Sequence, residues 1–183
     1  MTRPDDVEYG VYYITSDYLG VGRRLVIDLG DAVIAGLASV SFSLVVSLFV
    51  SDDNALGLAV LITWAAVGFA YFVLLKRSRV RTLGYRLARA RIVNLRGEVP
   101  SVAALTIRLL FVIFGPLNLL LDLFWIPSDP SRQALRDKFA HTYVVRDASK
   151  PAGKGEIRYA TYTILGGSFL FQEVRGAASP SAA

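Results

Sequence analysis

Three long apolar runs dominate the pattern of hydrophobic and polar positions along the chain. The first covers residues 25–50 with two charged residues, the second covers residues 55–75 with none, and the third covers residues 102–126 with two. A membrane-spanning helix needs about 20 apolar residues. The first two runs therefore predict transmembrane helices at about residues 23–50 and 55–76. The third predicts a further apolar helical segment.

The middle of the third run contains residues that interrupt a helix. Gly115, Pro116 and Asn118 lie close together there, and proline lacks the backbone N–H that a continuous helix uses. A kinked helix that still spans the membrane is one interpretation. The other is a re-entrant hairpin, which we favour because the residues after Pro127 are rich in lysine and arginine and such residues collect on the cytoplasmic side.

Short β-branched stretches follow the apolar runs. Arg89–Asn94 and Thr142–Arg146 are typical of strands, Glu8–Ile14 is expected to be extended, and the segments on both sides of Leu165–Gly167 predict a hairpin. Strands pair only when they lie on one side of the membrane. The predicted fold class is thus a mainly α membrane protein, with two transmembrane helices, a third kinked or re-entrant segment and a small cytoplasmic β-cap.

The same features divide the chain into three parts. Residues 1–17 form an N-terminal cytoplasmic segment, residues 18–146 the membrane domain, and residues 147–183 a C-terminal tail with the hairpin. The first apolar run is longer than the apolar core of a signal peptide. We expect it to remain as a membrane anchor.

The net charge of +5 is unevenly distributed. Residues 76–98 hold eight lysines or arginines against the single Glu98, whereas the turn Ser51–Asn54 holds none. By the positive-inside rule this basic loop and the N-terminus are cytoplasmic in a multi-pass chain. The loop is also expected to attract anionic lipid headgroups. No motif indicates nucleic-acid binding.

Few residues are suited to catalysis. The chain has no cysteine and a single histidine, His141, so thiolate chemistry, disulfides and a zinc site are not expected. No catalytic triad or glycine-rich phosphate loop is recognisable. We therefore expect neither an enzyme nor a cofactor.

Charged residues inside the apolar runs are the candidate functional residues. Arg24, Asp28 and Asp31 are spaced to share one helix face, and a charge near the bilayer centre costs roughly 2.5–3.5 kcal/mol. Arg108 is predicted at the depth of Asp31, which suggests an ion pair between them. In the hairpin, Asp122 would lie near Asp28, where the two acids share a proton or hold a cation.

Two further features have a structural and a functional interpretation. Asp137, in a basic stretch, is expected to pair with a nearby arginine or lysine and hold the β-cap in place. The alternative is a role at the cytoplasmic opening of a transport path. Ala35, Ser39, Ser43 and Ser47 recur every four residues, which favours a seam of small packed residues over the lining of a path.

These residues together resemble the RDD family of bacterial membrane proteins, over roughly residues 18–146. The family pattern has an arginine seven residues before an aspartate, as in Arg24 and Asp31, and a second aspartate before a Thr-x-Val-Val strand, as in Asp137. The loop glycines and the third-segment arginine also match, at Gly84, Gly97 and Arg108. The chain departs from the pattern where Arg136 replaces a frequent histidine, Tyr85 replaces a lysine, and Asp28 is additional.

The resemblance implies a protein of the bacterial cytoplasmic (inner) membrane, with proposed transport and, for some members, sodium–proton exchange. Our first hypothesis is a small transporter or a cation/proton exchange subunit that uses the intramembrane carboxylates. Since a few short helices cannot enclose a pathway, it predicts a homo-oligomer. The alternative is a non-transporting scaffold or accessory module whose buried Arg–Asp pairs hold the helices together.

Overall fold

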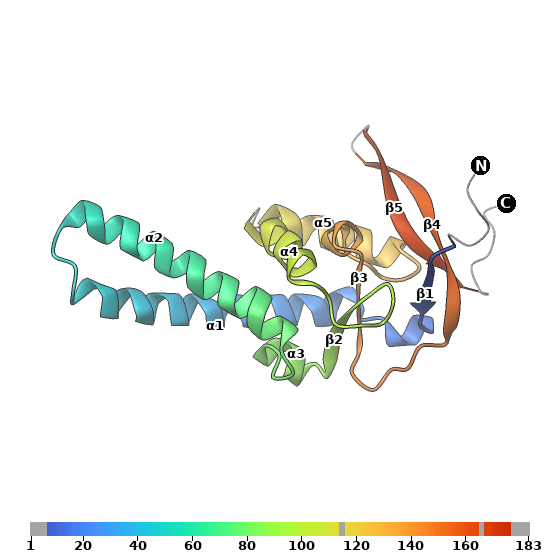
Figure 1. The fold of residues 1–183 in the computed structure, drawn as a ribbon, viewed down its shortest axis with the longest axis horizontal. Coiled ribbons are helices and arrows are strands. Elements are labelled where there is room, and N and C mark those ends of the chain that lie inside the picture. The colour runs from blue at the N-terminus through green and yellow to red at the C-terminus, as the bar shows by residue number, and fades with distance from the viewer. Residues whose placement is uncertain (1–6, 114–115, 165–166, 177–183) are drawn as a thin grey trace.

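Two long helices form an arm that projects from a body of shorter helices and strands (Figure 1). The computed structural model describes residues 7–113, 116–164 and 167–176. In the arm, α1 (Val21–Ser47) runs antiparallel to α2 (Asp53–Phe69), and α2 continues as the π-helix η3 (Ala70–Leu75). Asp52 caps α2 by accepting a hydrogen bond from the backbone N–H of Ala55 at 2.7 Å.

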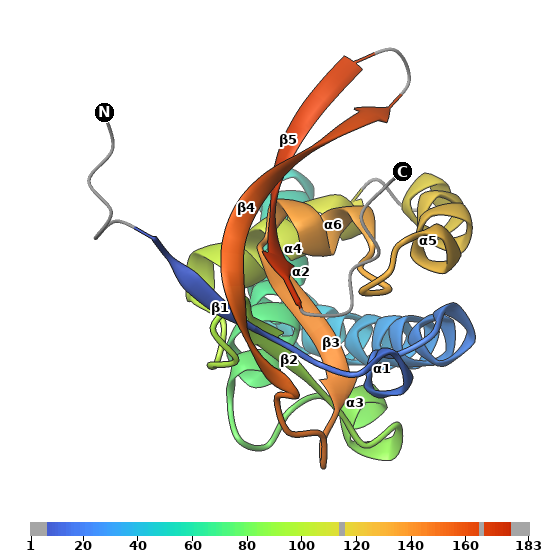
Figure 2. The same ribbon diagram turned by 90° about the vertical axis from the view of Figure 1, so that its right-hand side faces the viewer.

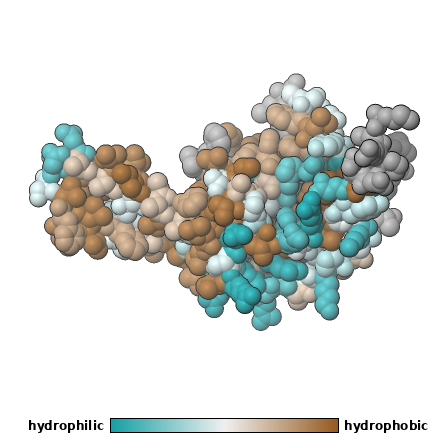
Figure 3. Space-filling view, viewed as in Figure 1, coloured by the Kyte–Doolittle hydropathy of each residue, from teal (hydrophilic) through white to brown (hydrophobic). Residues whose placement is uncertain are grey.

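The surface of the arm is apolar along its length and polar at its tip (Figure 3). The apolar windows of Val21–Ser47 and Asp53–Leu75 are only 17% and 6% buried within the chain. The core helix of a soluble protein would be mostly covered, so these two helices have the length, composition and exposure of membrane-spanning segments.

The small residues of α1 pack against α2. Ala35 and Ser39 are buried, and the Ser43 hydroxyl accepts a hydrogen bond from Trp64 Nε1 at 3.1 Å. Short side chains allow the two helices to approach closely. This part of the stripe is therefore a packing seam.

The third apolar run forms two helices, α4 (Val102–Ile113) and α5 (Pro116–Ser128), with residues 114–115 outside the described ranges. A third short helix, α6 (Leu135–Phe139), lies between them and contacts both (Figure 2). Of the helix-interrupting residues, Pro116 is the first residue of α5 and Asn118 lies within that helix, whereas Gly115 is outside the described residues.

The strands form two small antiparallel sheets. The strand β2 (Ala90–Asn94) pairs with β3 (Thr142–Arg146), with Ile92 opposite Val144, which confirms the pairing expected for these segments. The other sheet, which we name the outer sheet, has the order β1-β4-β5. Its bounds are Tyr9–Tyr12 for β1, Gly153–Ile164 for β4 and Gly167–Arg175 for β5. Leu165 and Gly166 of the predicted hairpin turn lie outside the described residues.

The β2–β3 ribbon is buried on both faces. Ile92 and Val144 belong to a core cluster with Ile27, Val73 and Leu105 of the apolar helices. The alternate residues of the ribbon, among them Val93, Tyr143 and Val145, belong to a second cluster, which packs against the β4–β5 hairpin. Because successive strand residues point to opposite faces, the ribbon joins the apolar helices to the outer sheet. Two short elements, η2 (Thr15–Asp17) and α3 (Leu83–Leu87), complete the body.

Candidate functional site

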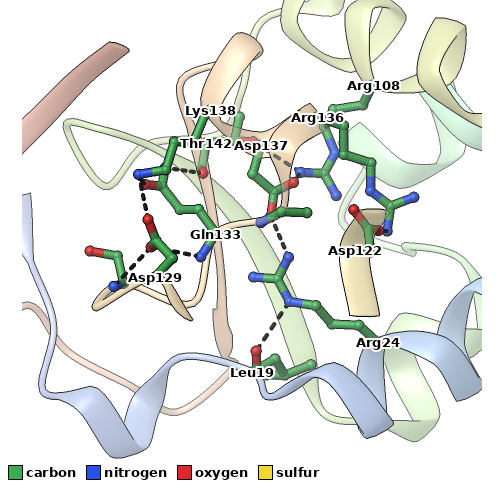
Figure 4. A network of polar contacts seen from close by, with 12 residues as sticks. Leu19, Arg24, Arg108, Asp122, Asp129, Gln133, Arg136, Asp137, Lys138 and Thr142 are labelled. Carbon is green, nitrogen blue, oxygen red and sulfur yellow. Dashed lines mark hydrogen bonds and ion pairs between the residues drawn. The ribbon is translucent and has the colours of Figure 1, made fainter. Parts of the chain in front are cut away.

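Three consecutive charged residues of α6 are buried at the centre of the body. Arg136, Asp137 and Lys138 are 3%, 0% and 1% exposed. Successive residues of a helix point about 100° apart, so the three side chains face three different sets of partners (Figure 4). An ionised group away from water is costly unless it is paired, and each of the three is paired.

Asp137 binds two arginines from different helices. Its carboxylate accepts a hydrogen bond from Arg24 of α1 and forms an ion pair with Arg108 of α4. Both arginines have a second contact: Arg24 Nε donates to the Leu19 carbonyl at 3.1 Å, and Arg108 donates to Thr142 Oγ1 of β3 at 3.0 Å. Asp137 therefore fixes α1, α4 and α6 to one another.

Arg136 binds two aspartates, one from α1 and one from α5. Its guanidinium donates to Asp28 of α1 and lies 3.1 Å from a carboxylate oxygen of Asp122 in α5. Burial disfavours the charge, but the attraction of Asp28 and Asp122 outweighs it and raises the pKa of Arg136 above its ordinary value. The guanidinium stays charged at any physiological pH.

These contacts form two triads centred on the neighbouring α6 residues Asp137 and Arg136, and we name the two together the arginine–aspartate cluster. Its six members are Arg24, Asp28, Arg108, Asp122, Arg136 and Asp137. Three positive and three negative charges from α1, α4, α5 and α6 balance within it. Removal of any one member leaves a buried charge without a partner, or with fewer partners than it has in the complete cluster.

Lys138 lies in a second buried group on the side of the outer sheet. Its ammonium lies 2.5 Å from the carboxylate of Asp129, forms an ion pair with Glu173 of β5, and donates to the Tyr162 hydroxyl of β4 at 3.2 Å. Burial lowers and the two carboxylates raise the pKa of Lys138, with a net increase. Burial, together with a hydrogen bond to Glu173, raises the pKa of Tyr162 to about 12. Lys138 thus anchors the β4–β5 hairpin to α6.

Asp31 lies outside both groups and is fully buried. Its carboxylate accepts hydrogen bonds from Thr82 Oγ1 at 2.6 Å, the Gly84 backbone N–H at 2.9 Å, and the Tyr71 hydroxyl at 3.0 Å. A Cβ atom at Gly84 would lie 2.8 Å from both Asp31 Oδ1 and the Ile27 carbonyl oxygen. Only glycine therefore lets the first turn of α3 approach this carboxylate so closely.

The structure places five of the six predicted charged residues together and corrects the pairing of the sixth. The predicted Asp31–Arg108 ion pair is wrong, because Arg108 pairs with Asp137 and Asp31 is bound by neutral donors. Asp28 and Asp122 do lie near each other. The cation between them is the guanidinium of Arg136, which occupies the position expected for a shared proton or bound cation.

Sequence reasoning missed several residues of these groups. They are Tyr71, Thr82, Asp129, Arg136, Lys138, Tyr162 and Glu173. The consecutive charges of Arg136, Asp137 and Lys138 could have indicated buried ion pairs. Consecutive side chains of a helix point in different directions, so a helix that is packed against apolar segments cannot turn all three toward solvent. Within the described ranges, no three His, Asp or Glu residues are grouped so that they would hold a metal ion.

We predict that Asp137→Asn destabilises the protein far more than Asp28→Asn. The first change leaves Arg24 and Arg108 without their carboxylate, at an expected cost of about 3–5 kcal/mol. The second leaves Asp122 beside Arg136, and about 1.5–3 kcal/mol is expected from one lost charged hydrogen bond. Denaturant unfolding of the purified chain in detergent measures both, with the exposed Asp53→Asn as control. Equal midpoints for Asp137→Asn and the wild type would contradict this assignment.

We predict that the Lys138 group loses stability in alkali. The pKa values of Lys138 and Tyr162 are raised on folding, so their contribution is fully present below the ordinary values of about 10 and is lost as the pH rises through the raised ones. Tyrosinate absorbance of the wild type minus that of Tyr162→Phe, recorded against pH, should show a midpoint near 12. A midpoint near 10 would show that Tyr162 is not held by Glu173.

Comparison with known proteins identifies the family. Searches of the curated proteins and of the solved structures found no match. The model of the RDD family matches residues 18–141. That range contains α1 to α6, all six residues of the arginine–aspartate cluster, Asp31 and Gly84. Since the match covers more than half of the chain, the protein belongs to the RDD family.

Proposed function

We propose that the chain is a multi-pass protein of the bacterial inner membrane whose N-terminus, basic loop and two sheets are all cytoplasmic. The pairing of β1 with β4 and of β2 with β3 supports this arrangement, because paired strands share one side of the membrane. The eight basic residues of the loop 76–98 support the cytoplasmic assignment. The polar tip of the arm is then the outer end.

In this arrangement α4 and α5 form a re-entrant hairpin. Their 12 and 13 residues correspond to about 18–20 Å, which is shorter than the roughly 30 Å of a hydrocarbon core. Arg108 of α4 and Asp122 of α5 both reach α6. A straight helix would separate these residues by about 21 Å along its axis.

Single cysteines test the topology directly, because the chain has none of its own. A membrane-impermeant maleimide should label Asp53→Cys in intact cells. The exposed positions Arg86→Cys and Tyr159→Cys should be labelled only after the membrane is permeabilised. Labelling of Tyr159→Cys in intact cells would place the outer sheet outside and refute the hairpin.

We propose further that the protein is a non-enzymatic scaffold or accessory module, in which buried charges hold a cytoplasmic cap rigidly on a membrane arm. One observation carries this proposal: every carboxylate of the arginine–aspartate cluster is already bound to an arginine. A proton carrier needs a carboxyl group that titrates near neutral pH, and a neighbouring guanidinium opposes its protonation. The geometry therefore favours the scaffold over exchange at these residues.

Cation or proton transport is the second candidate function, and a different residue favours it. Asp31 is a buried carboxylate of α1 that contacts only neutral donors within the described residues. One of these donors, Tyr71, lies in the π-helix η3, and π-helical turns are frequent at functional sites. Two spanning helices cannot enclose a path, so this candidate requires a homo-oligomer.

Cation-triggered proton movement in inverted membrane vesicles separates the two functions. The scaffold proposal predicts that wild type, Asp31→Asn and empty vesicles give the same signal with sodium, lithium and potassium. Asp53→Asn is the control for a carboxylate lost outside the body. Exchange in the wild type and in Asp53→Asn, but not in an equally expressed Asp31→Asn, would replace the scaffold proposal with transport at Asp31.

A further inference from the structure

A groove runs along the first turns of α1, and residues of α3 and Arg146 at the end of β3 also line it. The helix α3 contacts α1 in this region (Figure 2). Its volume is about 920 Å³, and Val26, Gly30, Ile34 and Leu87 form much of its apolar wall. The groove exists because glycine leaves this face of α1 bare: a Cβ atom at Gly22 or Gly30 would meet nothing within 4 Å.

One end of the groove opens into a smaller, basic pocket. This pocket has a volume of about 270 Å³ and shares Gly22, Arg23 and Arg146 with the groove. It adds Arg132, and no acidic residue lines it. The single acid of the larger groove, Asp147, is paired with Arg81 at 2.9 Å. The combined site is therefore apolar along its length and positive at one end.

Two of the three arginines at that end are free to bind an anion. Arg23 and Arg146 are exposed, and within the described residues their guanidinium groups have neither an ion pair nor a hydrogen bond. Arg132 donates one hydrogen bond, to the Tyr18 carbonyl oxygen at 3.5 Å, and has no carboxylate partner in the part of the chain that the structure describes. These arginines differ from Arg24, which immediately follows Arg23 and is paired with Asp137. The first turn of α1 adds to the positive potential, since Gly20 provides no side-chain cap and the turn has no acidic residue.

The position of the site along α1 matches the boundary between headgroups and hydrocarbon. Arg23 precedes the apolar run that begins at Leu25. From Val26 to Ile34 the groove follows α1 for about 12 Å, in the direction of the arm tip. A molecule that fills both parts has a negative group at the interface and a hydrocarbon chain that points into the bilayer.

We propose that this groove is a binding site for an anionic glycerophospholipid. The phosphate binds Arg23, Arg132 and Arg146, and one acyl chain lies along Val26, Gly30 and Ile34. Zwitterionic lipids are disfavoured, because the basic pocket offers no carboxylate to their ammonium group. The inference depends on the membrane placement proposed above but not on the choice between scaffold and transport.

The test measures binding of phosphatidylglycerol to the purified full-length chain in detergent, by native mass spectrometry and by the shift of the unfolding temperature. Phosphatidylcholine and inorganic phosphate are the comparison ligands. The double variant Arg23→Gln/Arg146→Gln removes the charges, and Gly30→Leu places a side chain in the groove at a position where a Cβ atom would meet nothing within 4 Å. Arg158→Gln/Arg175→Gln on the outer sheet and Gly36→Leu on α1 are the matched controls, because they make the same changes outside the groove and outside the basic loop.

We expect the wild type and both controls to retain phosphatidylglycerol in preference to phosphatidylcholine. Arg23→Gln/Arg146→Gln and Gly30→Leu should each weaken this binding at least tenfold. Equal binding of the two lipids, or equal losses in the groove variants and their controls, would overturn the proposal. Displacement of the lipid by inorganic phosphate, together with unchanged binding to Gly30→Leu, would identify an anion site without an acyl chain and also overturn it. None of these readouts depends on ion exchange.

Discussion

Burial of three consecutive charges on α6 is the constraint on which the rest of the structure depends. Each buried ion costs several kcal/mol unless its partners are in place, and the partners of Arg136, Asp137 and Lys138 come from α1, α4, α5 and the outer sheet. The three charges of α6 are all paired only when each of these elements is in place. The long apolar helices and the outer sheet are therefore expected to fold as one unit.

The apolar contacts reinforce the same connection. The β2–β3 ribbon contributes alternate residues to the core cluster of the apolar helices and to the cluster that packs against the β4–β5 hairpin. The outer sheet is therefore held in a fixed position relative to the helices. A body bound in this way is suited to hold surfaces in fixed positions. Asp31 differs from the other buried carboxylates because no positively charged residue that the structure describes pairs with it. Its carboxylate accepts hydrogen bonds from Tyr71 in the π-helix and from Thr82 and Gly84 at the start of α3.

Much of the fold was predictable because it depends on patterns that are local in the sequence. The two spanning helices follow from apolar length, and the β2–β3 pair follows from two β-branched stretches. The partners of the charges were not predictable in the same way. Counting residues from the membrane boundary places Asp31 and Arg108 at one depth, but depth does not give the direction in which each side chain points around its helix.

The missed residues have physical reasons of their own. Arg136 and Lys138 follow an apolar segment, where basic residues ordinarily face the cytoplasm, and only the tertiary structure shows that they are buried. The hydrogen bond that Asp31 accepts from Gly84 comes from a backbone N–H and not from a side chain. A sequence indicates such a donor only through the glycine that lets the backbone approach.

The order in which the chain is made gives the arginine–aspartate cluster a consequence for biogenesis. Arg24 and Asp28 enter the membrane with α1, but their α6 partners lie 113 and 108 residues further along the chain. Until α6 has been made, Arg24 and Asp28 have only each other as partners of opposite charge on α1. A chain that stops before α6 therefore leaves both residues without the partners that they have in the complete cluster.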